Sequence, residues 1–278
     1  MIFSKQALFE HYHQPDLLKS MLVALREAGK DIERLTRRDL RAFDEFHIRG
    51  LEATRELATL ARFKDGMHIL DLGCGIGGPA RALADEYGCT VIGVDLIESY
   101  CATATELTRL VGLQERVEFQ QGDIAQLPFT DSSFDGVWSL HSIMNTPLLS
   151  QAIAEIQRVL RSQGVYAFYE VCEGTHSPPR FPVPWAGDER MSCLIKPEAF
   201  RDHLESAGLT VTEWQDNSDV CCNWFRKRVA RLKAQETPPG PGMELLMGAN
   251  MIEKSANVVR NLEEDRIRVI MGTATTCA

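Results

Sequence analysis

The sequence predicts a doubly wound α/β domain built on a mostly parallel sheet. Residues 68–79 (HILDLGCGIGGP) run from an apolar strand through a glycine-dense turn into a helix that begins near Pro79. From residue 67 to residue 171, strand-like runs alternate with helical patterns. Such alternation implies parallel strands joined by right-handed crossovers.

The length and composition are typical of a globular protein. The chain has 278 residues, 44% of them hydrophobic, which is enough to bury a full core. Its net charge of −9 disfavours nucleic acid and anionic lipid as partners and leaves small-molecule chemistry open. Neither an apolar run of membrane-spanning length nor a signal-peptide pattern is present, so we expect a cytoplasmic protein with no membrane partner.

The cysteines and histidines predict no metal site. No pair of the eight cysteines has the C-x-x-C spacing of zinc or redox sites, so we expect most of them to be reduced thiols. Cys74, inside the glycine turn, is interpreted as a small residue selected for fit. The histidines without partner spacing for a metal are His11, His68, His176 and His203.

The glycine turn predicts a ligand site at the carboxyl end of the first strand. Gly73, Gly75 and Gly77 let the backbone turn tightly and approach a ligand that side chains would keep away. The stretch also fits the G-x-G-x-x-G pattern of dinucleotide sites. Asp71, two residues before the first glycine, would repel a pyrophosphate and favours a cationic ligand.

Two later strands are also followed by acidic residues. The predicted strand 90–95 ends in Asp95, where a carboxylate can accept hydrogen bonds from both hydroxyls of a ribose. A third strand over 117–120 is followed by Asp123 and Ile124. Taken alone, Asp123 is equally well explained as a turn residue. Three successive acidic strand ends favour a binding role.

Over residues 67–171 these motifs resemble those of the Rossmann-like methyltransferases that use S-adenosylmethionine (SAM). The resemblance implies SAM as cofactor, with Asp71 near its methionine part and Asp123 and Ile124 at its adenine. It also implies a seven-stranded sheet whose last strand is antiparallel. The chain looks most similar to small-molecule methyltransferases related to the sarcosine/dimethylglycine N-methyltransferases and to natural-product tailoring enzymes.

Residues 1–62 predict a helical N-terminal cap that is too small to be a complete domain. Apolar residues recur at helical spacing over 17–25 and 51–60. We expect the cap to lie over the ligand edge of the sheet, with packing on the far side as the alternative. In that position the cap would bring Phe9, Tyr12, His13 or the turn 47–50 near the cofactor.

The regular alternation of strand and helix patterns stops after residue 172. The proline-rich stretch 174–193 predicts a long structured loop of the kind that forms lids. The predicted elements after it are a helix over 197–207, a strand over 210–214, a helix over 223–235, a break at 238–242, a helix over 243–262 and the last strand over 266–273. The basic residues of 226–231 are interpreted as a solvated helix face.

The expected organisation therefore has three parts. The N-terminal cap covers 1–62, the SAM-binding core covers 63–175, and residues 176–278 hold the lid loop, the late helices and the last two strands of the same sheet. The complete set of expected cofactor-binding residues is Asp71, Gly73, Gly75, Gly77, Asp95, Leu96, Asp123, Ile124, Tyr12 and Gly50.

The end of the fourth predicted strand, 134–140, supplies a candidate catalytic residue. Methyl transfer from a sulfonium is an in-line displacement, in which positioning and desolvation lower much of the barrier. An amine acceptor needs only its lone pair, whereas an oxygen or carbon acceptor needs a base. His141 is the candidate base, and a histidine that caps the strand or touches the cofactor is an equal alternative.

The acceptor is expected to be a small amine, hydroxyl or carbon compound, methylated without a metal. The chain has neither the D/N/S-P-P-Y/F turn of DNA amino-methyltransferases after the fourth strand nor the acid-rich metal set of catechol-type enzymes. Two other functions stay open. One is a SAM-fold protein that catalyses a cyclisation or serves as a ligand-binding module. The other is a nicotinamide-dependent oxidoreductase, which Asp71 disfavours. A homo-oligomer is also left open.

Overall fold

The computed structural model describes residues 3–234, 243–248 and 250–277. Its centre is a seven-stranded sheet with the order β3-β2-β1-β4-β5-β7-β6. The first five strands are parallel, and β7 is antiparallel to both β5 and β6. This confirms the predicted sheet. The strands are β1 (His68–Leu72), β2 (Thr90–Asp95), β3 (Val117–Gln121), β4 (Phe134–Leu140), β5 (Leu160–Glu173), β6 (Leu209–Asp216) and β7 (Ile267–Thr276).

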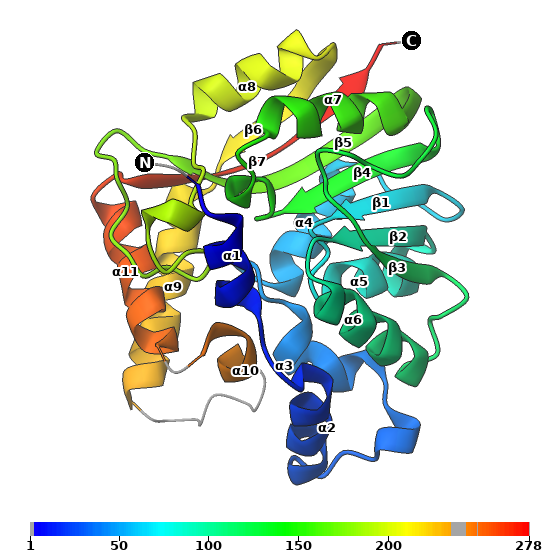
Figure 1. Cartoon of the computed structure of the whole chain (residues 1–278), viewed down its shortest axis with the longest axis vertical. Helices are drawn as coiled ribbons and strands as arrows, with labels where there is room; N and C mark the ends of the chain where they lie inside the picture. The colour runs from blue at the N-terminus through cyan, green and yellow to red at the C-terminus, as the bar shows by residue number, and fades with distance from the viewer. Residues whose placement is uncertain (1–2, 235–242, 249, 278) are drawn as a thin grey trace.

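Helices cover both faces of the sheet (Figure 1). One face packs against α7 and α8, and the other packs against α4, α5, α9 and α11. β1 shows why both faces are buried, because Ile69 points to the α4 and α5 side while Leu70 and Leu72 point to the α7 side. The core helices are α4 (Leu51–Leu60), α5 (Gly78–Tyr87), α6 (Glu98–Leu110), α7 (Leu149–Val159), α8 (Pro197–Ser206), α9 (Ser218–Ala234), α10 (Met243–Met247) and α11 (Met251–Glu263).

The N-terminal segment is helical, as predicted. Its helices before α4 are α1 (Lys5–Tyr12), α2 (Leu17–Glu27), η1 (Ile32–Arg34), η2 (Arg37–Leu40) and α3 (Arg41–Asp44). α2 packs on α6 through a separate apolar cluster that includes Met21, Leu25 and Leu107. α1 lies at the end of the sheet where β1 and β4 terminate (Figure 1). Only part of the segment is therefore at the ligand edge, because α4 packs on a face of the sheet.

Three predicted boundaries differ from the structure. The residues RSQG at 161–164 predict a turn from their sequence, whereas in the structure they belong to β5, whose register against β4 shifts between Phe134 and Gly136. α9 begins at Ser218, where Asp216 Oδ1 accepts a hydrogen bond from the Ser218 backbone N–H at 3.0 Å. The helix predicted over 243–262 is two helices, because Gly248 takes a left-handed φ of 73° that ends α10. The predicted break at 238–242 lies outside the described residues.

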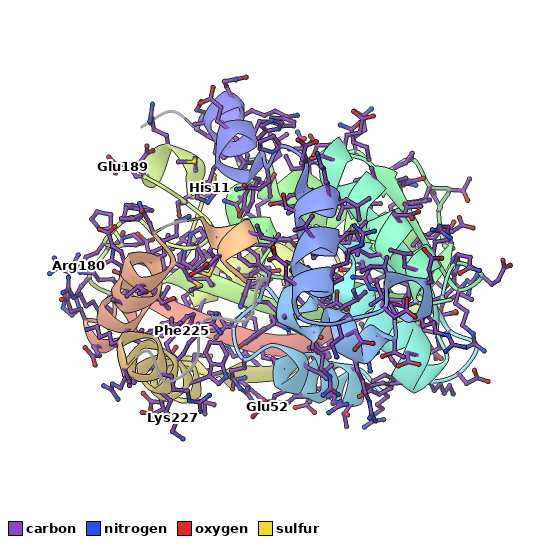
Figure 2. The ribbon with its side chains drawn as sticks, turned by 90° about the horizontal axis from the view of Figure 1, so that it is seen from below. His11, Glu52, Arg180, Glu189, Phe225 and Lys227 are labelled. Atoms are coloured by element: carbon purple, nitrogen blue, oxygen red, sulfur yellow. The ribbon has the colours of Figure 1, made fainter. Side chains whose placement is uncertain are left out.

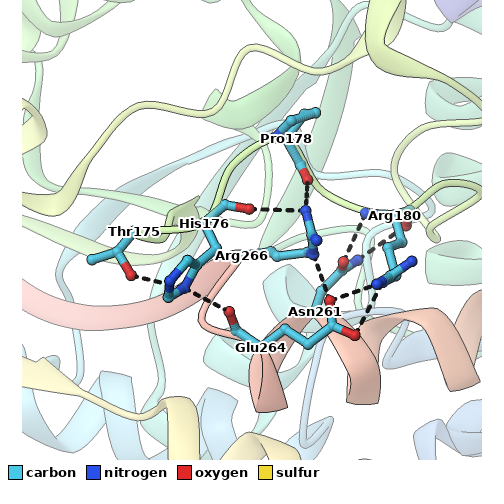
Figure 3. Close-up of polar contacts among 7 residues, drawn as sticks. All are labelled: Thr175, His176, Pro178, Arg180, Asn261, Glu264 and Arg266. Carbon is cyan, nitrogen blue, oxygen red and sulfur yellow. Dashed lines mark hydrogen bonds and ion pairs between the residues drawn. The ribbon is translucent and has the colours of Figure 1, made fainter.

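The proline-rich loop after β5 is held against the end of α11 (Figure 3). Asn261 Oδ1 accepts a hydrogen bond from the Arg180 backbone N–H at 2.7 Å, and Asn261 Nδ2 donates one to the Arg180 carbonyl at 3.0 Å. Arg266 donates to the carbonyls of His176 and Pro178, and Glu264 binds both Arg180 and Arg266. This anchor supports the base of the loop. Within the described residues, no helix is both long enough and apolar enough to cross a membrane.

Candidate functional site

A cavity of about 460 Å³ lies at the carboxyl ends of β1, β2 and β4. Its volume is in the range of small-molecule sites. Its wall is built by the N-terminal helices, the glycine turn, the strand ends, the proline-rich loop and α9 to α11. The structure brings to this wall most of the residues singled out from the sequence, namely Asp71, Gly73, Gly75, Asp95, Leu96, Asp123, Ile124, Tyr12 and His141.

Two of the expected cofactor residues, Gly77 and Gly50, do not line the cavity. Gly77 has a φ of 81°, and a Cβ there would collide with the ring of Phe119. Gly50 has a φ of 53° and precedes α4, and its carbonyl oxygen lies 2.9 Å from His47 Nε2. Both glycines take a positive φ, which side chains rarely allow, and their contact with the cofactor stays a prediction. Phe9 and His13 of the N-terminal segment also lie outside the cavity wall.

Asp71 is a buried carboxyl group on the cavity wall. It is 2% exposed, and within the described part of the chain its Oδ2 has no hydrogen-bond partner. Burial, with a smaller contribution from the charge of Asp95, raises the pKa of Asp71 to about 8. A buried oxygen without a donor is costly, and a ligand that supplies a cationic N–H group removes that cost. Asp71 therefore suits the positive ligand expected from the sequence.

Asp95 shapes the glycine turn. Its Oδ2 accepts a hydrogen bond from the Gly75 backbone N–H at 2.9 Å, and its Oδ1 accepts one from Ile97 at 2.9 Å. A Cβ on Gly75 would meet nothing within 4 Å although Gly75 lines the cavity, so open space lies beside it. Gly73 is different, because a Cβ there would collide with Ser142. The lack of a side chain therefore leaves open space beside Gly75 and lets Ser142 pack against Gly73.

Asp123 makes a turn contact and also lines the cavity. Its Oδ1 accepts a hydrogen bond from the Ala125 backbone N–H at 3.0 Å, which is a turn contact, and its side chain also lines the cavity. Lys5 of α1 lies 3.5 Å from Asp123 Oδ2 in an exposed ion pair. Such a pair contributes little to stability. It nevertheless shows that α1 reaches across the cavity to the loop after β3.

His141 presents a neutral imidazole to the cavity. Its backbone takes a left-handed φ of 53°, and its N–H donates to the Tyr169 carbonyl at 2.8 Å. Its ring lies 4.5 Å from the ring of Tyr169, and neither ring nitrogen has a partner among the described residues. Burial, followed by the neighbouring His47, holds the pKa of His141 well below its usual range. The buried ring nitrogens therefore have no hydrogen bond from the described part of the chain.

Glu45 is a cavity residue that the sequence did not single out. Its Oε2 accepts a hydrogen bond from the Thr54 hydroxyl at 3.1 Å and lies 3.5 Å from His47 Nε2. Burial, with the charge of Asp44, raises the pKa of Glu45 to about 7. His47, whose pKa burial lowers to about 4, lies with its ring 6.4 Å from that of His141. No local sequence pattern indicates that Glu45 is a site residue, because its place on the cavity wall depends on how the N-terminal segment docks.

Three segments that are distant in sequence close over the cavity. The Tyr12 hydroxyl donates to Asn145 Oδ1 at 3.1 Å and lies 3.4 Å from the Trp185 carbonyl oxygen. Asn145 Nδ2 donates to the carbonyls of Trp185 and Met191 at 3.0 and 2.7 Å. Asn145 belongs to η3 (Ile143–Asn145) and Met191 to η4 (Glu189–Met191). One amide thus joins α1, the loop after β4 and the proline-rich loop.

A buried ion pair docks α3 on the glycine turn. Arg81 Nη2 lies 2.6 Å from Asp44 Oδ1, and the two side chains are 0% and 3% exposed. Arg81 Nη1 also donates to the Thr108 hydroxyl at 3.0 Å. A Cβ on Gly78 would collide with the backbone of Asp44, so only glycine allows this approach. The ion pair and the glycine together place Asp44 and Glu45 beside the cavity.

A family model described as a methyltransferase domain matches residues 70–168. These residues form a methyltransferase domain. The match covers the strands and turns that carry Asp71, Asp95, Asp123 and His141. It confirms the resemblance drawn from the sequence motifs.

The chain also has curated relatives. It is 39% identical over 123 residues to 24-methylenesterol C-methyltransferase 2 of Oryza sativa subsp. japonica, and the aligned part covers 43% of this chain and 34% of that protein. It is 34% identical over 133 residues to methyltransferase GfsG of Streptomyces halstedii, which covers 48% of each protein. The chain thus spans between a third and a half of the length of these two relatives.

Solved structures resemble the chain beyond the methyltransferase domain. The [4+2]-cyclase SpnF superposes with a TM-score of 0.70 at 21% identity over 100% of this chain and 99% of that one. A putative sarcosine dimethylglycine methyltransferase from Galdieria sulphuraria superposes with a TM-score of 0.66 at 19% identity, covering 82% of this chain and 85% of that one. At these identities, the likenesses show the fold alone.

Proposed function

We propose that this protein binds SAM and transfers its methyl group to a small-molecule acceptor without a metal. The observation that carries the proposal is one cavity lined by both Asp71 and His141, which have a carboxyl oxygen and two ring nitrogens without hydrogen-bond partners among the described residues. The matched methyltransferase domain supports the same reaction. In this proposal the cofactor occupies the edge near β1 and β2, and the acceptor occupies the space beside His141.

The acidic residues fit the groups of SAM. Asp71 would accept a hydrogen bond from the ammonium of the methionine part, which meets the cost of its buried oxygen. Asp95 accepts one backbone hydrogen bond at each oxygen and keeps lone pairs for ribose hydroxyls. Asp123 and Ile124 would hold the adenine. Bound SAM supplies an electrophilic methyl group, and the chain supplies its position and the exclusion of water.

The rest of the cavity wall suits an apolar acceptor. Aromatic and aliphatic side chains from the loops and the late helices line it, among them Leu8, Met144, Trp185, Trp224, Phe225, Met247 and Val258. His141 has its ring nitrogens free among the described residues and stays unprotonated at neutral pH, since its pKa is lowered. It would therefore accept the proton of a hydroxyl or an acidic carbon without first losing one of its own.

Calorimetry with SAM and transfer of a labelled methyl group to amines, phenols and polyketides test the proposal. We expect SAM to bind, one class to be methylated, and EDTA to leave turnover unchanged. Failure of SAM to bind would overturn the assignment, and a loss of turnover on EDTA treatment that Mg²⁺ restores would overturn its metal-free part. SAM binding without transfer, together with cyclisation of a polyene, would select the alternative of a SAM-fold protein that has no transferase activity.

Two matched glycine variants separate the cofactor site from general strain. Gly75→Val places a side chain in the open space of the cavity, whereas Gly66→Val imposes a similar strain, at a φ of 81°, outside the cavity wall. We expect Gly75→Val to lose SAM binding and Gly66→Val to retain it. Equal SAM affinity in the two variants would contradict the placement of the cofactor.

The location and the assembly of the protein stay predictions. We infer that it acts in the cytoplasm, the location expected in the sequence analysis. Fractionation of cells that produce the protein checks this inference. Sedimentation of the purified chain measures whether it forms the homo-oligomer left open by the sequence.

A further inference from the structure

The basic residues of α9 do not share one environment. The sequence favoured a solvated face for the whole group. Arg226 follows that expectation, because it is exposed and pairs with Glu263 at 2.8 Å. Lys227 lies at the outer edge of the molecule (Figure 2). Arg228 instead lines the cavity together with Trp224 and Phe225 of the same helix.

Arg228 lies among apolar groups. Its guanidinium carbon is 5.5 Å from the centre of the Trp224 ring, and its Nη2 is 4.0 Å from Met251 Sδ. Met247 and Val258 line the same part of the cavity wall. In the part of the chain that the structure describes, Arg228 forms no ion pair with a carboxylate. Its N–H donors therefore have only weak partners there, although a guanidinium offers five of them.

Arg228 of α9 and Lys254 of α11 are both partly buried cations. Burial, followed by the charge of Arg231, lowers the pKa of Arg228, and burial also lowers the pKa of Lys254 on α11. Lys254 donates to the Met247 carbonyl at 2.8 Å and, among the described residues, forms no ion pair. A partly buried cation with no counter-ion is costly. This cost is removed when a ligand brings an anion.

The cavity is polarised as a result. Its edge at β1, β2 and the N-terminal segment carries Asp71, Asp95 and Glu45, whereas its wall at α9 carries Arg228. Figure 1 shows α9 on the left of the molecule and β1 and β2 on the right. A cationic cofactor is attracted to the acidic edge, whereas the basic wall at α9 attracts an anionic group of a ligand.

We propose that Arg228 is an anion-binding subsite that holds the carboxylate or phosphate of an otherwise apolar acceptor. This inference rests on the proposed function and narrows its substrate class. The guanidinium offers a planar, paired set of donors that matches both anions. The apolar residues around it receive the hydrocarbon part of the ligand.

Binding of three probes that share one alkyl chain tests the subsite. Calorimetry on the full chain compares octanoate, octyl phosphate and octanol. We expect the wild type to bind one or both anions more tightly than octanol by on the order of tenfold or more, since a charged hydrogen bond replaces water at a partly buried cation. The anion with the larger preference identifies whether the subsite takes a carboxylate or a phosphate.

Variants of the two neighbouring arginines supply the control. Arg228→Met should remove the preference for the anions and leave octanol binding unchanged, Arg228→Lys should keep part of the preference, and Arg226→Met should leave it intact. We expect Arg228→Met to melt no lower than the wild type, because the change removes a desolvated charge. Thermal melting of the three variants measures this.

Two results would overturn the subsite. One is a wild type that does not prefer either anion over octanol, and the other is a preference that survives in Arg228→Met. SAM binding is measured separately on the same samples. If SAM does not bind while the anion preference depends on Arg228, the proposed function fails and the subsite stands.

Discussion

Several buried carboxyl groups around the cavity are held close to their neutral form. Burial raises the pKa of Asp71 to about 8 and that of Glu45 to about 7, and it also raises the pKa of Asp95. Glu170, beneath the loop after β4, has its pKa raised to about 8 by burial and accepts a hydrogen bond from the Ser142 backbone N–H. A bound cation stabilises the ionised form of such groups and offsets the desolvation of their charge. The cavity therefore favours a positive ligand.

The first prediction at the scale of single residues concerns how SAM binding by Asp71 depends on pH. In the free protein Asp71 keeps its proton up to about pH 8, whereas a cationic ligand favours the carboxylate. SAM binding should therefore release a proton at pH 7, and the contribution of Asp71 to SAM affinity should rise by up to about tenfold per pH unit below its pKa and level off above it. Calorimetry in two buffers of different ionisation enthalpy measures the proton release.

Asp71→Asn checks this assignment. We expect the variant to release less proton and to bind SAM about tenfold or more weakly, since a charged hydrogen bond is lost. The raised pKa also means that ionisation of Asp71 destabilises the free fold as pH rises from about 4 to about 8, so the variant should melt higher than the wild type at pH 8. Asp65→Asn, at an exposed site, is the control. Equal proton release in wild type and Asp71→Asn would refute the prediction.

The second residue-scale prediction concerns His141. With a hydroxyl or acidic carbon acceptor, His141→Ala should lose about 10²- to 10⁴-fold in kcat with little change in SAM affinity. With an amine acceptor the loss should be much smaller. Because the pKa of His141 is well below its usual range, the ring stays neutral between pH 8 and pH 6. Protonation of His141 should therefore not lower the wild-type kcat over this range. A fall near pH 6.5 that disappears in His141→Ala would show an imidazole with an ordinary pKa.

At the scale of elements, the closure of the cavity depends on contacts between separate segments. α1, the loop after β4 and the proline-rich loop meet at Asn145, and α1 adds a hydrogen bond from the Ser4 backbone N–H to the Arg190 carbonyl at 2.9 Å. The base of the proline-rich loop is held separately at Asn261. We infer that the tip of that loop and α1 form a lid, which is held by these polar contacts and by the burial of Leu8, Val183 and Trp185 in the main core.

The prediction at this scale uses two tyrosines. Tyr12→Phe removes a hydroxyl that binds Asn145, whereas Tyr87→Phe removes an exposed hydroxyl that donates to the Arg55 carbonyl. Each change should cost about 1 kcal/mol or less in the free energy of unfolding, and only Tyr12→Phe should raise the rate of SAM dissociation and of hydrogen exchange in α1. Stopped-flow release of SAM and exchange measured by mass spectrometry check this. The same SAM dissociation rate in both variants would contradict a lid.

At the scale of the whole molecule, the N-terminal segment and the methyltransferase domain are one folding unit. α4 contributes Ala53, Leu57 and Ala58 to the main core, and all three are fully buried. Arg81 of the domain has its charge compensated by Asp44 of the segment. Removing the whole segment would therefore expose core side chains and leave Arg81 without its carboxylate.

The ion pair between Asp44 and Arg81 gives the prediction at this scale. Asp44→Ala leaves a buried guanidinium uncompensated and should lower the free energy of unfolding by about 3–5 kcal/mol, whereas the double variant Asp44→Leu with Arg81→Leu should recover most of it. Glu106→Ala, which breaks the exposed pair with Arg109, should cost about 0–1 kcal/mol. Urea unfolding measures all three. A double variant as unstable as Asp44→Ala would mean that packing dominates over charge.

The acidic edge of the cavity could be predicted because its sequence signals are local. Asp71 and the glycines after it are adjacent in the chain, and the strand, the turn and the start of α5 are determined by neighbouring residues. The acidic ends of β2 and the loop after β3 follow the same rule. Parallel strands then place these ends on one edge of the sheet, so sequence order is enough to bring them together.

The sequence by itself thus determined the sheet, the glycine turn and the acidic edge, which depend on local backbone preferences and periodic burial. The tertiary structure alone decided that Glu45 lines the cavity beside His47, that Arg228 lines the cavity whereas Arg226 pairs with Glu263, and that Gly77 packs against the ring of Phe119. The physical reason is that these features arise from side-chain packing between segments that are far apart in the chain. Their energies depend on docking geometry, which no spacing within one segment encodes.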